Sequence, residues 1–177
     1  MADVAALTGN QAYLNALDKI WMNVVGKKLY LTGGIGSTGA WEGFGPDYEL
    51  PNSAYAETCA SIANAFWNYR MFLLKADARF IDVLERASYN AMLSGLSLSG
   101  DRFFYPNPLF SVGQYERSPW FARACCPSNI PRFVLGFPGY TYATSENRVF
   151  INLYVSGRAR VPIAGGNLVL EQVTNYP

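Results

Sequence analysis

The hydrophobic pattern of this 177-residue chain changes its period once, and that change restricts the folds available to it. Up to about residue 95, apolar residues recur every three or four positions, as they do along the buried face of an α-helix. From Tyr140 onward, apolar and polar residues alternate, as they do along a half-buried β-strand. Helices that precede strands in this way favour the α+β class and often indicate two domains.

Several stretches of the chain carry the pattern of a helix. The first runs from about Asn10 to Val25. Two more are marked by apolar stripes, which consist of Ile62, Phe66, Tyr69 and Leu73, and then of Phe80, Leu84, Ala87 and Ala91. Because the connection near Ala76 and Asp77 is short, we expect these two helices to be antiparallel neighbours. A shorter helix is predicted near residues 127–135, since Pro127 is tolerated in a first helical turn.

The segments between the helices are predicted to be extended or irregular. A short extended piece is expected at Lys28 to Leu31, followed by a loop from Thr32 to Asn52. A loop this long is unusual in a compact domain and more often has a function than not. The aromatic and proline-rich stretch from Phe103 to Pro108 is expected to be extended or turned. Strands are expected at residues 140–142, 149–155, 159–161 and 168–170, with turns at Asn147 and at Gly165-Gly166.

The absence of histidine removes several chemistries at once. Neither a Ser-His nor a Cys-His catalytic pair can form within this chain, and the commonest metal ligand is missing. A catalyst built from this chain alone must use carboxylates, thiols, tyrosine or lysine.

The charge and the apolar content exclude other partners. Lysine and arginine number 14 against 13 acidic residues, which gives a formal net charge of +1 and no basic stripe for nucleic acid. No apolar stretch approaches the roughly 20 residues that a membrane span needs. The first residues lack the pattern of a signal peptide. The localisation stays open, although reduced cysteines are compatible with the cytoplasm.

Three cysteines, Cys59, Cys125 and Cys126, are the most suggestive polar residues. Their odd number and the adjacent pair argue against a disulfide framework and favour reduced thiols in a shared site. Glu57 adds a carboxylate at the start of a predicted helix, where Asn52 and Ser53 are candidate capping residues. Three thiolates and one carboxylate suit tetrahedral Zn²⁺. The alternative is that the thiols are ordinary buried cysteines without a ligand.

A glycine motif in the long loop could indicate a nucleotide-binding site. Gly34, Gly36 and Gly39 fit G-x-G-x-x-G, but a dinucleotide site also needs a helix that begins at this loop. The helix-breaking segment Trp41–Pro46 follows instead. A shaped loop is therefore the favoured interpretation.

Two further residues are candidates for chemistry. Glu42 lies between Trp41 and Phe44, and a carboxyl group among aromatic side chains can serve as a general acid. The alternative is a solvated loop carboxylate, as expected for the nearby Asp47 and Glu49. Tyr105 lies among aromatic residues and prolines, where a core or stacking aromatic residue is the alternative to a functional one.

Several separated motifs, taken in order, resemble those of one enzyme family. They are Leu31-Thr-Gly-Gly-Ile-Gly-Ser, Glu42-Gly-Phe, Asp47-Tyr-Glu-Leu-Pro-Asn, Tyr55-Ala-Glu57-Thr-Cys59-Ala-Ser, Phe104-Tyr105-Pro-Asn107-Pro108-Leu and Ala124-Cys125-Cys126-Pro-Ser-Asn129. From about Lys28 to its end, the chain resembles the β-L-arabinofuranosidases of glycoside hydrolase family 127. Motifs that keep their order across so much of a chain are far more specific than any one of them.

The resemblance implies a retaining glycosidase with a cysteine nucleophile. Cys125 takes the position of the nucleophile, Glu42 that of the acid/base, and Tyr105 that of a substrate-binding tyrosine. The implied zinc ligands are Glu57, Cys59, Cys125 and Cys126. The expected substrate is an arabinose-containing oligosaccharide or glycoconjugate, with the exact sugar and linkage left open. A second hypothesis is a zinc-binding structural or assembly module without turnover, because both functions keep the four ligands.

The resemblance also implies a larger fold, of which this chain is expected to be a fragment. Residues 1–138 correspond to the later part of an (α/α)6 barrel, and residues 139–177 to the first strands of a β-sandwich. The family's substrate-binding histidines lie in the earlier half of the barrel, so the absence of histidine fits such a fragment. A half barrel exposes apolar surface, through which self-association is expected.

Overall fold

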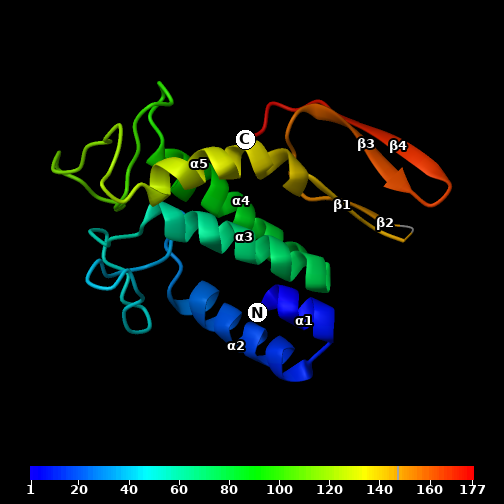
Figure 1. Cartoon of the computed structure of the whole chain (residues 1–177), viewed down its shortest axis with the longest axis horizontal. Helices are drawn as coiled ribbons and strands as arrows, with labels where there is room; N and C mark the ends of the chain where they lie inside the picture. The colour runs from blue at the N-terminus through cyan, green and yellow to red at the C-terminus, as the bar shows by residue number, and fades with distance from the viewer. Residues whose placement is uncertain (147) are drawn as a thin grey trace. The chain divides into compact units, whose positions relative to one another are not determined.

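The computed structural model describes residues 1–146 and 148–177, and the chain divides into two units, Met1–Pro131 and Arg132–Pro177 (Figure 1). The described residues form five α-helices and, toward the end of the chain, two small antiparallel sheets, so the α+β class is confirmed. The α-helices are α1 (Ala2–Thr8), α2 (Gln11–Lys27), α3 (Thr58–Lys75), α4 (Ala78–Arg86) and α5 (Cys125–Gly136). No helix in the described part of the chain has the length and apolar character needed to cross a bilayer.

Local signals explain where the helices begin and end. Asn10 caps α2, because its side-chain oxygen accepts the backbone N–H of Ala12 at 2.9 Å. The expected short connection between α3 and α4 is confirmed: Ala76 ends α3 in the left-handed conformation, and Asp77 caps α4 by accepting the N–H of Arg79. The helix α1 was not predicted, since seven residues are too few for a periodic pattern to stand out.

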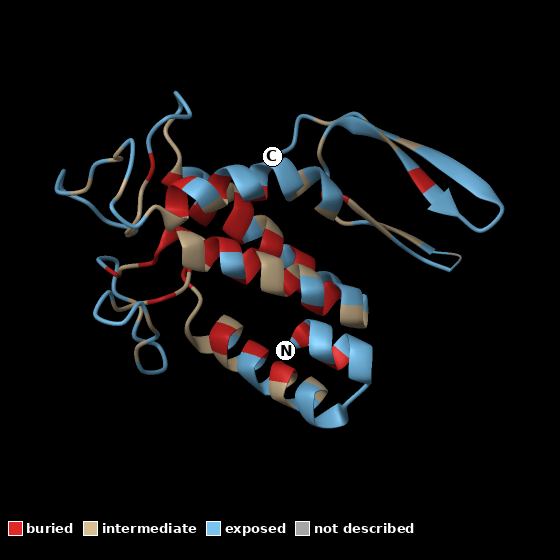
Figure 2. Cartoon of the chain, viewed as in Figure 1, coloured by how far each residue is buried: buried red, intermediate tan, exposed pale blue. Residues whose placement is uncertain are grey.

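The core of the first unit lies where α2, α3 and α4 meet. The ring of Trp21 packs edge-on against Phe80, with centroids 4.9 Å apart, and its indole N–H donates to Asn68 Oδ1 at 2.7 Å. The Asn68 amide in turn donates to the backbone oxygen and Oδ1 of Asn64. All four side chains are buried, and Figure 2 shows the concentration of buried positions on α3 and α4. The polar groups are tolerated inside because each has a hydrogen-bonding partner.

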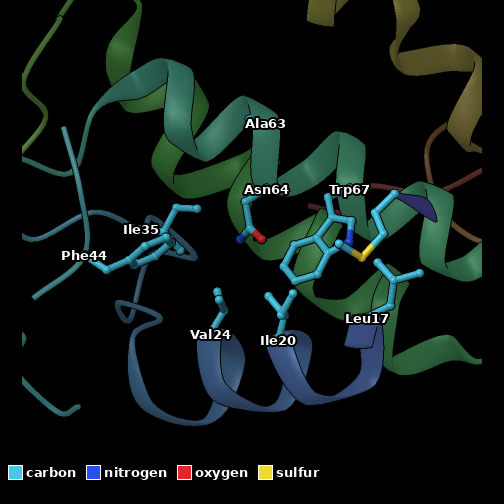
Figure 3. Close-up of a pocket in the computed structure, with 9 residues that line it drawn as sticks. Leu17, Ile20, Val24, Ile35, Phe44, Ala63, Asn64 and Trp67 are labelled. Atoms are coloured by element: carbon cyan, nitrogen blue, oxygen red, sulfur yellow. The ribbon is translucent and has the colours of Figure 1, made fainter. Parts of the chain in front are cut away.

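An apolar pocket opens between α2 and α3, with a cavity volume of about 340 Å³ (Figure 3). Leu17, Ile20 and Val24 line it from α2, and Ala63, Asn64 and Trp67 line it from α3. Ile35 and Phe44 of the long loop and Met1 complete the lining. The apolar stripe of α2 is therefore only partly covered, as the 44% exposure of Ile20 shows.

The segment from residue 28 to residue 57 contains neither a helix nor a strand, which confirms the predicted long loop. The expected extended piece at Lys28 to Leu31 was wrong. A tight turn forms instead: Tyr30 N donates to Gly34 O and Gly33 N donates to Tyr30 O, both at 2.9 Å. Gly33 has a φ of +83°, which favours glycine, and its carbonyl accepts the Asn64 amide of α3 at 3.2 Å.

The end of α4 continues into a π-helical turn, η1 (Ala87–Met92), and a short 3-10 helix, η2 (Leu93–Gly95). The close approach of the long loop to η1 explains a second constraint on Gly33. A Cβ atom at Gly33 would lie 2.6 Å from the backbone nitrogen of Ala87, which is fully buried.

The second unit contains the 3-10 helix η3 (Phe137–Tyr140) and two antiparallel hairpins. Strand β1 (Tyr142–Ser145) pairs with β2 (Arg148–Ile151), and β3 (Gly157–Ile163) pairs with β4 (Gly166–Gln172). The expected turn at Gly165-Gly166 is confirmed, with Gly165 at a φ of +88°. The strand expected over residues 149–155 ends at Ile151, and the turn expected at Asn147 lies outside the described residues.

We expect Gly33→Ala to destabilise the fold more than Gly9→Ala. Both glycines have a positive φ, so both substitutions carry the strain of a left-handed alanine, about 1–2 kcal/mol. Only at Gly33 does the new Cβ meet a backbone atom, whereas nothing lies within 4 Å at Gly9. The extra cost from overpacking should be about 1–3 kcal/mol in the free energy of unfolding, measured by urea titration. Equal losses at the two positions would contradict the close approach of Gly33 to Ala87.

Candidate metal centre

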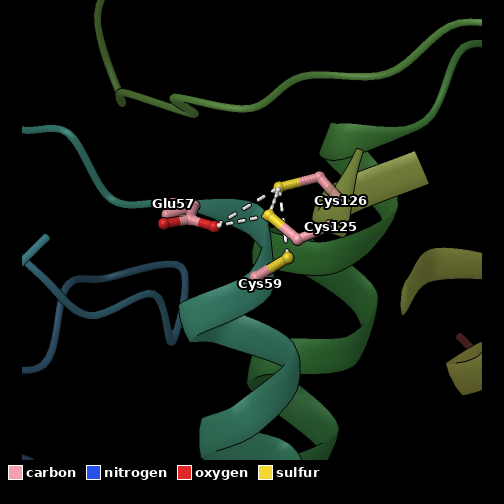
Figure 4. Close-up of side chains that lie close together, drawn as sticks. All are labelled: Glu57, Cys59, Cys125 and Cys126. Carbon is pink, nitrogen blue, oxygen red and sulfur yellow. Dashed lines mark hydrogen bonds between the residues drawn. The ribbon is translucent and has the colours of Figure 1, made fainter. Parts of the chain in front are cut away.

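Two helix starts bring the predicted ligands together (Figure 4). Glu57 immediately precedes α3, and Cys59 lies in its first turn. Cys125 and Cys126 are the first two residues of α5. Residues two apart point to different sides of a regular helix, so Glu57 and Cys59 can share a site only because Glu57 has left the helical conformation, with φ −53° and ψ 138°. The candidate caps Asn52 and Ser53 were wrong, since Glu57 occupies the N-cap position and no side chain caps this helix.

The four side chains form a compact donor set. The Cys125 and Cys126 sulfur atoms lie 3.3 and 3.5 Å from Glu57 Oε1. The Cys126 sulfur lies 3.8 Å from that of Cys125 and 3.2 Å from that of Cys59. All four donor atoms lie within 4.8 Å of one another. The structure therefore confirms that these residues form a group that could hold a metal ion.

Three of the distances between donor atoms fit tetrahedral coordination. Zn–S bonds of about 2.3 Å and Zn–O bonds of about 2.0 Å give sulfur–sulfur edges of about 3.8 Å and sulfur–oxygen edges of about 3.5 Å. The Cys125–Cys126, Cys125–Glu57 and Cys126–Glu57 distances agree with these edges. The Cys59–Cys126 distance is shorter than such an edge.

Burial gives an independent reason for a cation. Glu57 is 6% exposed and Cys126 is fully buried, while Cys59 and Cys125 are half-buried. Within residues 1–146 and 148–177, no lysine or arginine forms an ion pair with Glu57. A buried charge is normally paired with a counter-charge or coordinates a metal. A metal ion would supply the positive charge that this carboxylate lacks.

The three thiols differ in acidity. The hydrogen bond between the Cys59 and Cys126 sulfur atoms lowers the pKa of Cys59 and raises that of Cys126. Burial raises the pKa of Cys125. Without a metal, Cys125 and Cys126 therefore keep their protons at neutral pH, and a metal that binds all three sulfur atoms must displace them.

Asn129 is a site residue that the sequence did not single out beyond its place in a motif. Its amide Nδ2 donates a hydrogen bond to the Cys59 sulfur at 3.2 Å. The sequence spacing could have indicated this role, because Asn129 follows Cys125 by four residues and therefore lies on the same face of α5. A hydrogen bond of this kind orients a ligand and stabilises its thiolate form.

Tyr105 connects the donor group to Glu42. Its hydroxyl donates to Glu42 Oε1 at 3.4 Å. The neighbouring Cys125 thiol, together with burial, raises the pKa of Tyr105 well above its usual range. The ring packs edge-on against Phe121, with centroids 5.5 Å apart. All six residues singled out from the sequence therefore gather in one region, with Tyr105 between the carboxylate and the thiol.

The residues on either side of Glu57 hold the other parts of the site. Ala56 N donates to Gly36 O at 2.8 Å, which attaches the loop that carries Glu42. Thr58 N donates to Tyr105 O at 3.1 Å, which attaches the segment that carries the tyrosine. Backbone hydrogen bonds of Ala56 and Thr58 thus hold the loop of Glu42 and the segment of Tyr105 next to Glu57.

Glu42 lies in a tight turn whose ends are paired. Thr38 and Gly43 exchange backbone hydrogen bonds of 3.1 and 3.3 Å, and Glu42 has a φ of +51°. A left-handed conformation costs a non-glycine residue about 1–2 kcal/mol, and such strain is concentrated at functional sites. The turn is anchored at Gly39, where a Cβ atom would lie 3.0 Å from the ring of Tyr55.

Asp47, a neighbouring acid of the same loop, forms ion pairs with two lysines. Asp47 pairs with Lys27 at 2.7 Å and with Lys28 at 3.0 Å. Hydrogen bonds from these two ammonium groups hold the pKa of Asp47 well below its usual range. The arrangement ties the loop to the end of α2, which is a structural role.

The chain is similar to known proteins over its whole length. The family model for the GH127 catalytic domain of β-L-arabinofuranosidases matches residues 1–139. A non-reducing end β-L-arabinofuranosidase from Bifidobacterium longum subsp. longum is 34% identical over the whole chain. The chain covers 29% of that protein.

Solved structures give the same result. A GH127 β-arabinofuranosidase superposes with a TM-score of 0.97 at 56% identity, over 99% of this chain and 28% of that one. A GH127 β-L-arabinofuranosidase from Geobacillus stearothermophilus superposes with a TM-score of 0.95 at 40% identity, over 99% of this chain and 30% of that one. The chain thus spans less than a third of the length of these relatives. It belongs to the GH127 β-L-arabinofuranosidase family.

Proposed function

We propose that this chain carries the catalytic centre of a retaining glycosidase that acts on β-L-arabinofuranosides in oligosaccharides or glycoconjugates. The observation that carries the proposal is the contact of Tyr105 with both Glu42 and Cys125. A carboxyl group beside a thiol is the pair that a two-step displacement at a sugar requires. A purely structural metal site has no use for Glu42.

We also propose that the metal is Zn²⁺, held by Glu57, Cys59, Cys125 and Cys126. Three soft sulfur donors and one oxygen favour zinc over the hard cations Mg²⁺ and Ca²⁺. When bound, zinc would keep Cys125 in the thiolate form near neutral pH, where its raised pKa would otherwise leave it protonated.

In the first step, the Cys125 sulfur attacks the anomeric carbon while the bond to the leaving oxygen breaks. Glu42 donates its proton to that oxygen, and a thioglycosyl bond to Cys125 forms. In the second step, Glu42 takes a proton from water, the water oxygen bonds to the anomeric carbon, and the carbon–sulfur bond breaks. Two displacements at one carbon retain its configuration. Tyr105 lies beside both residues and can orient the sugar between them.

The two adjacent cysteines differ in a way that favours Cys125 as the nucleophile. Cys126 is fully buried and its sulfur faces Cys59 and Glu57. Cys125 is half-buried and neighbours the half-buried Tyr105. A substrate carbon can approach only the more accessible sulfur.

The larger fold expected from the sequence is part of the proposal. Residues 1–138 would form the later part of an (α/α)6 barrel and residues 139–177 the first strands of a β-sandwich. The antiparallel helices α3 and α4 and the end of the family match at residue 139 support this division. The expected self-association through exposed apolar surface stays a prediction, and the pocket between α2 and α3 is the surface that would serve it.

A zinc-binding structural or assembly module is the second candidate function. It is favoured by the number of ligands, because four protein donors close a tetrahedral site, as in structural zinc centres. The two candidates make different predictions for Glu42, which lies outside the donor set.

The first prediction concerns the metal. We expect the chain to bind about one zinc ion, as a four-donor site requires, and Cys126→Ser to weaken binding strongly. Ser128→Ala is the matched control, because Ser128 is an exposed α5 residue whose hydroxyl donates to the backbone oxygens of Ala124 and Cys125. Mass spectrometry measures the zinc content, and titration against a chelator measures the zinc affinity of each variant.

Zinc affinity should fall as the pH is lowered. The raised pKa values of Cys125 and Cys126 mean that binding releases protons, so added protons compete with the metal. A chelator titration at two pH values and the proton release in weakly buffered solution test this. Unchanged affinity in Cys126→Ser, or binding independent of pH, would contradict the proposed ligands.

A further prediction concerns catalysis. An aryl β-L-arabinofuranoside should be hydrolysed by the parent chain, and Cys125→Ser should abolish the activity. Glu42→Gln should lower kcat by about 10²–10⁴-fold, the usual effect of removing an acid/base group, while zinc stays bound. Glu49→Gln is the control, since Glu49 is an exposed acid of the same loop.

The outcomes separate the two candidate functions. Zinc binding without hydrolysis would leave the structural module as the function of this chain. Hydrolysis that survives Cys125→Ser would exclude Cys125 as the nucleophile, and equal effects of the two glutamate substitutions would exclude a specific role for Glu42.

A further inference from the structure

Trp41 presents an aromatic side chain to solvent beside the proposed acid/base. It is 82% exposed, whereas the core residue Trp21 is 7% exposed. Tryptophan has a large apolar surface and is well buried on average, so an indole this exposed leaves a large apolar area in contact with water. Trp41 immediately precedes Glu42 in the turn that Thr38 and Gly43 close.

The turn holds the indole in a defined place. The backbone pairing of Thr38 with Gly43 closes the turn, and the packing of Gly39 against the Tyr55 ring anchors it to the segment before Glu57. A Cβ atom on Gly43 would lie 3.4 Å from Trp41 Cδ1, in van der Waals contact. One edge of the indole therefore rests beside Gly43, and most of the remaining surface is open.

The chemistry of the reaction decides which part of a substrate lies near this indole. An acid/base must reach the glycosidic oxygen, so the leaving group lies on the side of Glu42. The attacking sulfur of Cys125 approaches the anomeric carbon from the opposite face. Because Trp41 directly precedes Glu42 in the chain, its backbone lies on the side of the leaving group.

We propose that Trp41 is a stacking platform for a sugar ring in the leaving group, an inference that rests on the proposed glycosidase function. The C–H groups on one face of a sugar ring are apolar and match the electron-rich face of an indole. Binding energy from such a remote contact can be used to lower the barrier of the chemical step. The chain would then favour an arabinofuranose linked to another sugar over one linked to a small alcohol.

The test compares two substrates that differ only in the leaving group: methyl β-L-arabinofuranoside and a β-L-arabinofuranosyl disaccharide. In Trp41→Ala, kcat/KM for the disaccharide should fall about tenfold, as the loss of one aromatic contact implies. For the methyl glycoside it should change by less than about twofold. Trp41→Phe should restore most of the loss. Tyr48→Ala is the control, because Tyr48 is an exposed aromatic residue of the same loop that lies near Lys27 instead.

A binding measurement separates this inference from the proposed function. In saturation-transfer NMR with the disaccharide, the protons of the leaving-side sugar should lose their signal in Trp41→Ala and keep it in Tyr48→Ala. If the parent hydrolyses neither substrate, the glycosidase function fails for this chain, and the NMR result alone decides whether Trp41 stacks on the sugar. Equal losses of kcat/KM on both substrates, or an unchanged NMR signal, would overturn the proposal.

Discussion

The buried carboxylate of Glu57 is the constraint on which the rest of the site depends. It lies among three cysteine sulfur atoms at the start of α3, and no basic side chain pairs with it in the described parts of the chain. A charge in that position is costly unless a cation joins it. The same position organises the surroundings, because Ala56 holds the loop of Glu42 and Thr58 holds the segment of Tyr105. One short stretch of backbone thus serves the metal ligands, the acid/base candidate and the tyrosine between them.

The sequence was sufficient for the parts of the fold that rest on local physics. The helix that becomes α2, the short connection at Ala76 and Asp77, and the turn at Gly165 follow from periodicity and from turn residues. The α+β class follows from the same change of period. The extended piece expected at Lys28 to Leu31 failed because its apolar residues lack a partner strand, and because Gly33 allows a tight turn against η1. That contact is between distant residues, and no local pattern reveals it.

For the candidate site too, residue chemistry predicted some features, whereas contacts between distant residues could not be predicted. Residue chemistry suggested that Glu57 and the three cysteines share a site, and the convergence of α3 and α5 confirms their proximity. The order of motifs, not the cysteine spacing, connected them to Glu42 and Tyr105. The role of Asn129 was missed because a hydrogen bond to sulfur depends on how two helices meet. The strained conformation of Glu42 was also invisible in the sequence, since glutamate has no preference for a positive φ.

The ligand set joins positions that are far apart along the chain. Cys59 and Cys126 are separated by 67 residues, and those residues include α4, η1 and the whole loop from residue 96 to residue 124. A metal ion bound by both ends would act as a reversible cross-link, which lowers the entropy of the unfolded chain as a disulfide does. The loop that carries Tyr105 contains neither a helix nor a strand, and it lies inside this closed segment. The ion proposed to keep Cys125 as a thiolate would therefore also restrain an irregular part of the first unit.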